Sequence, residues 1–205
     1  MIRFEIHLDT PHQRVIQKTA EELRNGKVVI YPTDTVYGIG CSIYAKHAIE
    51  KLYRLKGKSK FEAMSILCES IQQASKFVHI TNYTFRILKR CFPGPYTIIL
   101  RATREIPKLM LSRRKEIGVR IPDSPVCQML INELGHPLVN TSAGLSEDFI
   151  FHGQHSMDNE LLRHADIFLD AGPLPDPRDS TVIRLIDDEL EIIREGKGEI
   201  DRLLR

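Results

Sequence analysis

Several hydrogen-bonding side chains follow one apolar run near the start of the chain. Residues 28–31 are β-branched or aromatic, as a buried strand requires, and Pro32 lacks the N–H that would continue a β-ladder. The next residues carry three hydroxyls and one carboxylate, on Thr33, Asp34, Thr35 and Tyr37. Two interpretations stay open: a ligand site at the end of an α/β strand, or a turn whose side chains only satisfy their own backbone. Gly38 and Gly40 predict tight backbone geometry directly after this loop.

Basic side chains cluster in one segment and recur after two other apolar runs. The cluster, at the end of an expected helix and in the loop after it, contains Lys51, Arg54, Lys56, Lys58 and Lys60. Arg120 and Arg194 each follow an apolar run elsewhere in the chain. Separate elements could converge on one anion, because Arg makes bidentate phosphate contacts and Lys neutralises charge. A triphosphate and an RNA backbone both fit this pattern, and a solvated basic face is the alternative.

The common nucleotide-binding fingerprints are absent from the sequence. It contains no G-x-x-x-x-G-K-[ST] loop and no G-x-G-x-x-G sequence, so a bound nucleotide would not use a P-loop or a dinucleotide motif. The small residues at 141–144 offer an alternative, because backbone N–H groups and hydroxyls at a strand end can approach phosphate oxygens. Asp148, His152 and His155 lack a further spaced ligand, so a surface loop is favoured over a metal site there.

Composition predicts an ordinary globular protein of 205 residues, with 42% hydrophobic and 27% charged residues. No apolar stretch approaches a membrane span, and the first ten residues lack a signal-peptide centre, so we expect a cytoplasmic location and no membrane partner. A net charge of +2 by itself predicts no nucleic-acid partner. Because no C-x-x-C pair occurs, reduced and partly buried thiols are expected at Cys41, Cys68, Cys91 and Cys127.

Alternating helical and strand patterns predict an α/β sheet. Helices are expected over residues 11–24, 45–55, 81–90 and 125–134. Strands are expected over residues 28–31, 65–68, 96–102, 118–122, 138–142, 167–170, 181–186 and 190–194. The last two strands predict a closing hairpin across residues 187–189. Residues 144–160 are polar and irregular, and the three prolines of residues 172–180 favour a loop that could cover a cleft.

Seven short motifs resemble those of one family, and they occur in the family's order. They are YPTDTVYG at 31–38, LKGK at 55–58, PGPYT at 93–97, GVRIP at 118–122, TSA at 141–143, STV at 180–182 and REG at 194–196. On these residues the chain resembles the YrdC/YciO family, and its YciO branch most. The resemblance implies a single domain over residues 1–205, with a core over about 10–200. It also implies a twisted open mixed sheet with helices on its faces and a concave, positively charged face.

The resemblance implies the activity of a threonylcarbamoyl-AMP synthase. Such enzymes convert L-threonine, bicarbonate and ATP with Mg²⁺ into threonylcarbamoyl-AMP and pyrophosphate, for modification of adenosine 37 of tRNA. By position, threonine would be bound by Thr35 and Ser180, and the nucleotide by Lys56, Arg120, Ser142 and Arg194. Lys56 and Lys58 would be the catalytic residues, contacting phosphates or carboxylate. No protein ligand for a metal is implied.

Three positions depart from the synthase motifs. The synthases' Arg, His and Asn are here Lys58, Leu67 and Gly144. Lysine keeps the charge of arginine but loses its planar fork, while leucine and glycine remove an imidazole and an amide. Two hypotheses therefore remain: an enzyme that makes threonylcarbamoyl-AMP or a related carbamoyl nucleotide, or a protein that binds double-stranded RNA or a nucleotide without turnover.

Overall fold

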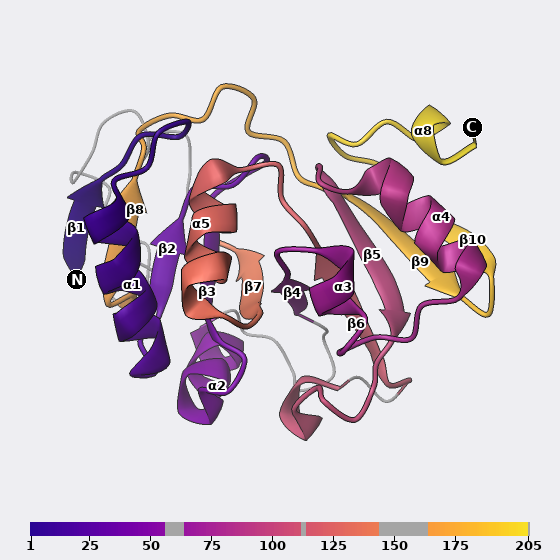
Figure 1. Ribbon diagram of the computed structural model, residues 1–205, viewed down its shortest axis with the longest axis horizontal. Coiled ribbons are helices and arrows are strands. Elements are labelled where there is room, and N and C mark those ends of the chain that lie inside the picture. Colours follow the sequence, from indigo (N-terminus) through magenta and orange to yellow (C-terminus); the bar gives the residue numbers. More distant parts are fainter. Residues whose placement is uncertain (56–63, 112–113, 144–163, 205) are drawn as a thin grey trace.

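A computed structural model describes residues 1–55, 64–111, 114–143 and 164–204. Ten strands of these residues form one sheet in the order β1-β8-β2-β3-β7-β4-β6-β5-β9-β10 (Figure 1). Strands β1 to β5 are Ile2–Glu5, Val29–Tyr31, Gly38–Ser42, Ser65–Leu67 and Tyr96–Arg101. Strands β6 to β10 are Glu116–Arg120, Leu138–Ser142, Ile167–Asp170, Thr181–Ile186 and Glu189–Arg194. Parallel and antiparallel neighbours alternate irregularly, so the expected mixed sheet is confirmed.

Helices pack on both faces of this sheet. They are α1 (Gln13–Arg24), α2 (Lys46–Leu55), α3 (Ile71–Ala74), α4 (Asn82–Cys91), α5 (Pro125–Leu134) and α8 (Asp201–Leu204). Successive side chains of a strand point to opposite faces, and β2 shows the result. Its Val29 and Tyr31 join a hydrophobic cluster with α1 and α5, whereas Ile30 joins a second cluster with α2 and α4. Two apolar layers thus hold the sheet between them.

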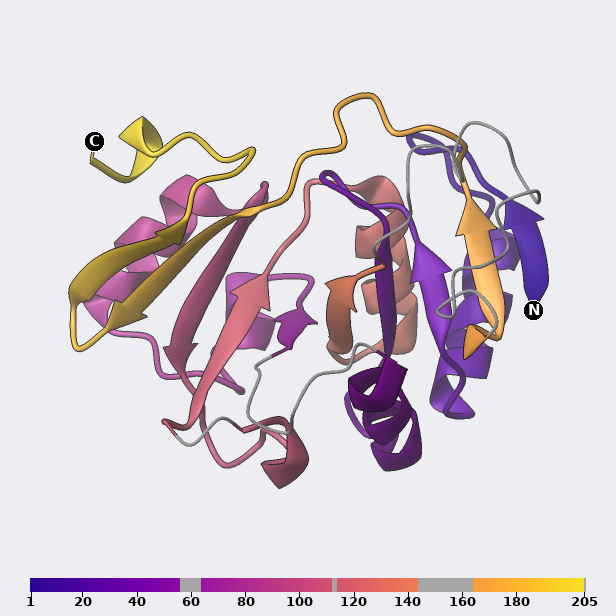
Figure 2. The same ribbon diagram turned by 180° about the vertical axis from the view of Figure 1, so that it is seen from behind.

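One part of the sheet carries no described helix on one side. Figure 2 shows α4 behind β5 and β9, with no described helix in front of these strands. In β5 buried residues alternate with half-buried or exposed ones, which fits a sheet with one covered face and one open face. The open face is therefore available for a site.

Most of the expected elements are present, and their ends agree with the structure within two residues. The hairpin expected across residues 187–189 is present, but Glu189 already pairs with Ile186, so the turn contains only Asp187 and Asp188. These two residues have positive φ angles of 54° and 64°. The short elements β1, α3, α8 and a 3₁₀ helix at Lys108–Met110 were not predicted, because each is too short to show a clear period.

The expectation for the glycines after the Thr33 loop was wrong. Gly38 and Gly40 lie inside the buried strand β3, which pairs with β2 and β7. The reason for glycine is close packing, because a Cβ on Gly40 would lie 2.3 Å from the Val139 carbonyl oxygen and 2.8 Å from the Tyr31 hydroxyl. The Tyr31 ring therefore occupies the space that a side chain at position 40 would need.

The four cysteines are free thiols, and all four are fully rather than partly buried. Burial raises the pKa of Cys91 and of Cys127 to about 12, so both stay protonated at neutral pH. They are core residues. No described helix is long and apolar enough to cross a membrane.

The glycine packing gives a stability prediction. Gly40→Ala must displace either the β7 backbone or Tyr31, so we expect a loss of about 1–3 kcal/mol or more in the free energy of unfolding. Gly135→Ala is the control: Gly135 has a φ of +80° with open space around it, and its loss should stay near 1 kcal/mol. Urea unfolding of both variants measures the difference. An equal or smaller loss for Gly40→Ala would show that β3 has room at this position.

Candidate functional site

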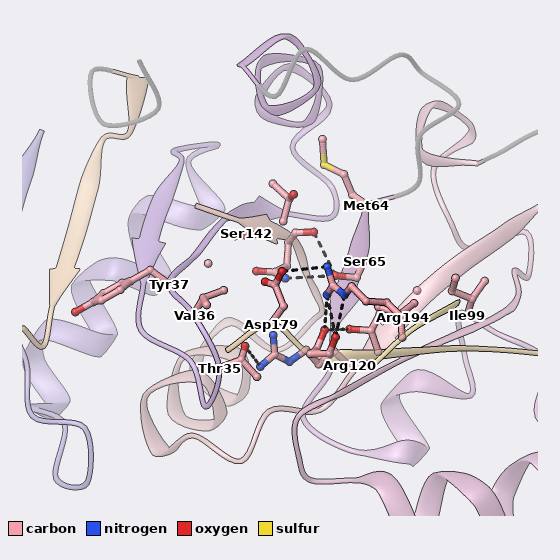
Figure 3. Close-up of a pocket in the computed structure, with 17 residues that line it drawn as sticks. Thr35, Val36, Tyr37, Met64, Ser65, Ile99, Arg120, Ser142, Asp179 and Arg194 are labelled. Carbon is pink, nitrogen blue, oxygen red and sulfur yellow. Dashed lines mark hydrogen bonds and ion pairs between the residues drawn. The ribbon is translucent and has the colours of Figure 1, made fainter. Parts of the chain in front are cut away.

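A cavity of about 260 Å³ is lined by the β2–β3 loop and by strands β3 to β7, β9 and β10 (Figure 3). Its wall includes five residues that the sequence singled out, Thr35, Arg120, Ser142, Ser180 and Arg194. They come from the β2–β3 loop, from β6, β7 and β10, and from the residue before β9. The structure thus brings these five residues together. Lys56, Lys58 and Gly144 lie outside the described residues, as do Asp148, His152 and His155.

Arg120 is the most buried charge of this site. It ends β6 with 5% of its surface exposed, and its Nη2 donates to Thr35 Oγ1 at 2.6 Å and to Thr33 Oγ1 at 3.2 Å. The same Nη2 donates to the carboxylate of Asp34. A guanidinium this far from water needs a nearby carboxylate and hydrogen-bond acceptors, and the loop supplies both.

The β2–β3 loop is both a turn and part of the cavity wall. The hydroxyl of Thr33 donates to the carbonyl of Val36 at 2.7 Å and accepts from the backbone N–H of Thr35 at 3.0 Å. Asp34 Oδ2 accepts from the backbone N–H of Asp123 at 3.1 Å. The turn interpretation is confirmed for Thr33, which satisfies the backbone of its own loop. Thr35 also lines the cavity, so a ligand site at this loop stays a prediction.

The opposite side of the cavity is formed where β9 begins and β10 ends. Arg194 donates to the Ser180 carbonyl from Nε at 3.2 Å and from Nη2 at 2.9 Å, and its Nη1 lies 3.2 Å from Asp179 Oδ2. The Ser180 hydroxyl lies 2.9 Å from that of Thr97. Residues 194 and 180 lie at the two ends of the β9–β10 hairpin and form one hydrogen-bonded corner.

Asn140 is a buried residue of the cavity wall that sequence reasoning missed. Its Oδ1 accepts from the Tyr31 hydroxyl at 2.8 Å, and its Nδ2 donates to Ser65 Oγ at 3.3 Å. Burial raises the pKa of Tyr31 far above its usual value, so this hydroxyl remains a donor. Asn140 precedes Ser142 by two residues in β7, and strand alternation could have placed both on the same face.

Thr97 and Asp179 also line the cavity and were not predicted to do so. Thr97 is the last residue of the motif at 93–97, and Asp179 directly precedes the motif at 180–182. Leu67, by contrast, does not line this cavity. It is fully buried in the apolar cluster with α1 and α5. Leu67 is therefore a core residue of this chain.

The described wall is balanced in charge. Asp34 lies against Arg120, and Asp179 lies against Arg194. The positive charge expected for this face is thus offset at both arginines. Arg120 Nε is buried without a hydrogen-bond partner among the described residues. No group of three or more described His, Cys, Asp or Glu side chains could hold a metal ion. The chemistry suited to this wall is hydrogen bonding by hydroxyls and guanidinium groups to a polar ligand.

The family model named Sua5_yciO_yrdC, with the description "Telomere recombination", matches residues 21–196. This chain belongs to the Sua5/YciO/YrdC family. It is 35% identical to the Escherichia coli K12 protein named "Uncharacterized protein YciO", over 98% of each chain. It is 33% identical to the Methanocaldococcus jannaschii "Putative threonylcarbamoyl-AMP synthase", over 94% of this chain and 91% of that protein.

Solved structures give the same family. The crystal structure of E. coli YciO matches with a TM-score of 0.86 and 33% identity, covering 99% of this chain and 100% of that one. P. abyssi Sua5, solved with L-threonine, matches with a TM-score of 0.85. At 23% identity over 99% of this chain and 60% of that one, this second likeness shows a shared fold. The Sua5/YciO/YrdC fold of the chain is therefore established.

The buried ion pair of this family member can be tested by a double-mutant cycle. The side chains of Arg120 and Asp34 are only 6% and 10% exposed. Asp34→Asn and Arg120→Met should each lower the free energy of unfolding by about 3–5 kcal/mol, because each leaves a buried charge unpaired. The double variant should lose less than the sum.

Asp187→Asn is the control for this cycle, since Asp187 pairs with Arg101 at 2.5 Å on the surface, with side chains 71% and 52% exposed. Its effect on urea unfolding should be small. Strictly additive losses in the Asp34 and Arg120 variants would mean that the two side chains do not stabilise each other.

Proposed function

We propose that this protein is an L-threonylcarbamoyladenylate synthase. It would join L-threonine, bicarbonate and ATP into threonylcarbamoyl-AMP and pyrophosphate, for modification of adenosine 37 of tRNA. The observation that carries the proposal is the meeting of Thr35, Arg120, Ser142, Ser180 and Arg194 at one cavity. These residues were assigned to threonine and nucleotide from sequence motifs alone, and a shared ligand site requires them to be adjacent.

The atoms of the reaction fix what the site must do. The amine of threonine takes up bicarbonate with loss of water, and an oxygen of the resulting carbamate displaces pyrophosphate from the α-phosphorus of ATP. No covalent bond to the protein is needed. Catalysis then depends on holding the carbamate in line with the α-phosphorus and on neutralising charge as pyrophosphate leaves.

Both sides of the cavity would contribute to the binding of each substrate. The hydroxyls of Thr35 and Ser180 would bind threonine, while Arg120, Ser142 and Arg194 would bind the nucleotide. Thr35 lies among buried groups that fix its position, as catalysis by orientation requires.

The triphosphate needs positive charge beyond the described wall, because Asp34 and Asp179 already balance Arg120 and Arg194. In this proposal Lys56 and Lys58 are the catalytic cations, and Mg²⁺ enters bound to ATP and stabilises the leaving pyrophosphate. The names of the archaeal relative and of the synthase from Vibrio vulnificus, which is 34% identical over 64% of this chain, agree with this activity.

The test is release of pyrophosphate from Mg-ATP, with L-threonine and bicarbonate omitted in turn. We expect pyrophosphate release that requires both co-substrates. Arg194→Gln removes the charged guanidinium and its hydrogen bonds, so kcat/KM should fall at least about tenfold in this variant. Lys108→Met, at the exposed position of the 3₁₀ helix, is the matched control and should leave turnover unchanged. The Vibrio vulnificus synthase provides the positive reference.

The alternative, binding of a nucleotide or double-stranded RNA without turnover, makes a different prediction in the same experiment. Pyrophosphate release would be absent while ATP or RNA still bound. RNA binding by a surface that contacts the phosphate backbone would also weaken steeply with salt. That combined result would overturn the synthase proposal.

A further inference from the structure

Lys197 connects two loops that form opposite sides of the cavity. Its Nζ donates to the carbonyl oxygen of Asp34 at 2.9 Å and to the carbonyl oxygen of Asp176 at 3.1 Å. Asp34 belongs to the β2–β3 loop, and Asp176 belongs to the segment between β8 and β9. One ammonium group thus joins segments that are more than a hundred residues apart in sequence.

The backbone around Lys197 is held where it can make this connection. The Lys197 N–H donates to the Asp179 carbonyl at 2.8 Å, and the Gly196 N–H donates to Thr181 Oγ1 at 3.0 Å. A Cβ on Gly196 would lie 2.3 Å from the Asp179 carbonyl oxygen, so only glycine allows this approach. The segment after β10 therefore runs along the start of β9, and Lys197 extends from it toward Asp34.

The segment between β8 and β9, residues 171–180, has a second attachment to the β2–β3 loop. The Tyr37 hydroxyl accepts from the Ala171 N–H at 2.9 Å and donates to the Gly172 carbonyl at 2.8 Å. Lys197 holds the middle of the segment, and Arg194 holds its end at Asp179 and Ser180. The segment is thus fixed at three points along its length.

The contact of Lys197 suits an ammonium group rather than an apolar side chain. The side chain is 26% exposed, and Nζ lies 3.6 Å from the carboxylate of Asp176. An ammonium has three donors, and two of them are used here by backbone carbonyls. Such charge-assisted hydrogen bonds are stronger than neutral ones, so the contact can fix the spacing of two loops.

We propose that Lys197 is a positioning residue that holds the Thr35 side and the Ser180 side of the cavity at a fixed separation. Because Lys197 donates a hydrogen bond to the Asp34 carbonyl, it also fixes the β2–β3 loop, whose carboxylate and hydroxyls surround Arg120. Lys197 does not line the cavity of about 260 Å³ and acts through other residues. Its effect on threonine rests on the proposed function, whereas its effect on the loops does not.

The first test is hydrogen exchange of the ligand-free protein, followed by mass spectrometry of peptides covering residues 32–37 and 171–180. In Lys197→Met both segments should exchange at least about tenfold faster, because a charged group's hydrogen bonds are lost. Lys197→Arg restores donors and should return exchange toward the wild-type rate, and Lys108→Met should not change it. Equal exchange in Lys197→Met and wild type would overturn the proposal.

The second test separates positioning from simple stabilisation. In the pyrophosphate assay, Lys197→Met should raise KM for L-threonine about tenfold and KM for ATP by a smaller factor, because in the proposed function Lys56 and Lys58 still bind the triphosphate. Lys197→Arg should restore both values toward wild type. Equal rises in both KM values, or no rescue, would overturn the positioning role. If the wild-type protein shows no turnover, that result contradicts the proposed function but not the positioning role of Lys197. Calorimetric binding of L-threonine to the wild type and the variants would then replace the comparison of KM values.

Discussion

The site depends on one buried interaction, between the guanidinium of Arg120 and the acceptors of the β2–β3 loop. Arg120 is only 5% exposed, and a buried charge is stable only where it is paired and hydrogen-bonded. Asp34, Thr33 and Thr35 supply these partners. The pair links β6 to the β2–β3 loop, although strands β4 and β7 lie between β6 and β3 in the sheet. The position of Thr35 is consequently set by the same contact that makes Arg120 acceptable in the interior.

The sheet order explains how residues distant in sequence share one ligand space. Strands β7, β4, β6, β5, β9 and β10 are consecutive neighbours, so side chains on one face of β7, β6 and β5 line a continuous wall. Both arginines of this wall are balanced by aspartates. The wall is therefore suited to orient a polar ligand, and in our proposal the charge of the triphosphate is met by Lys56, Lys58 and Mg²⁺.

Much of this arrangement could be predicted from the sequence, for identifiable physical reasons. Apolar periodicity located α1, α5 and most strands, and the motifs located Thr35, Arg120, Ser142, Ser180 and Arg194. Contacts that depend on tertiary packing could not be predicted. The hydrogen bond between Tyr31 and Asn140 joins two different strands, and so does the close packing of the Tyr31 hydroxyl against Gly40. Lys197 was missed for the same reason, because its two acceptors are backbone carbonyls of distant loops.

The central claim is that the Arg120 contact presents the Thr35 hydroxyl to a ligand. The most direct measurement is calorimetric binding of L-threonine, with Mg-ATP present, to Thr35→Val and Thr35→Ser. Valine keeps the shape of threonine without its hydroxyl, so we expect affinity to fall at least about tenfold, whereas serine should retain it within about threefold. Wild-type affinity in Thr35→Val, with an unchanged melting temperature, would contradict the account.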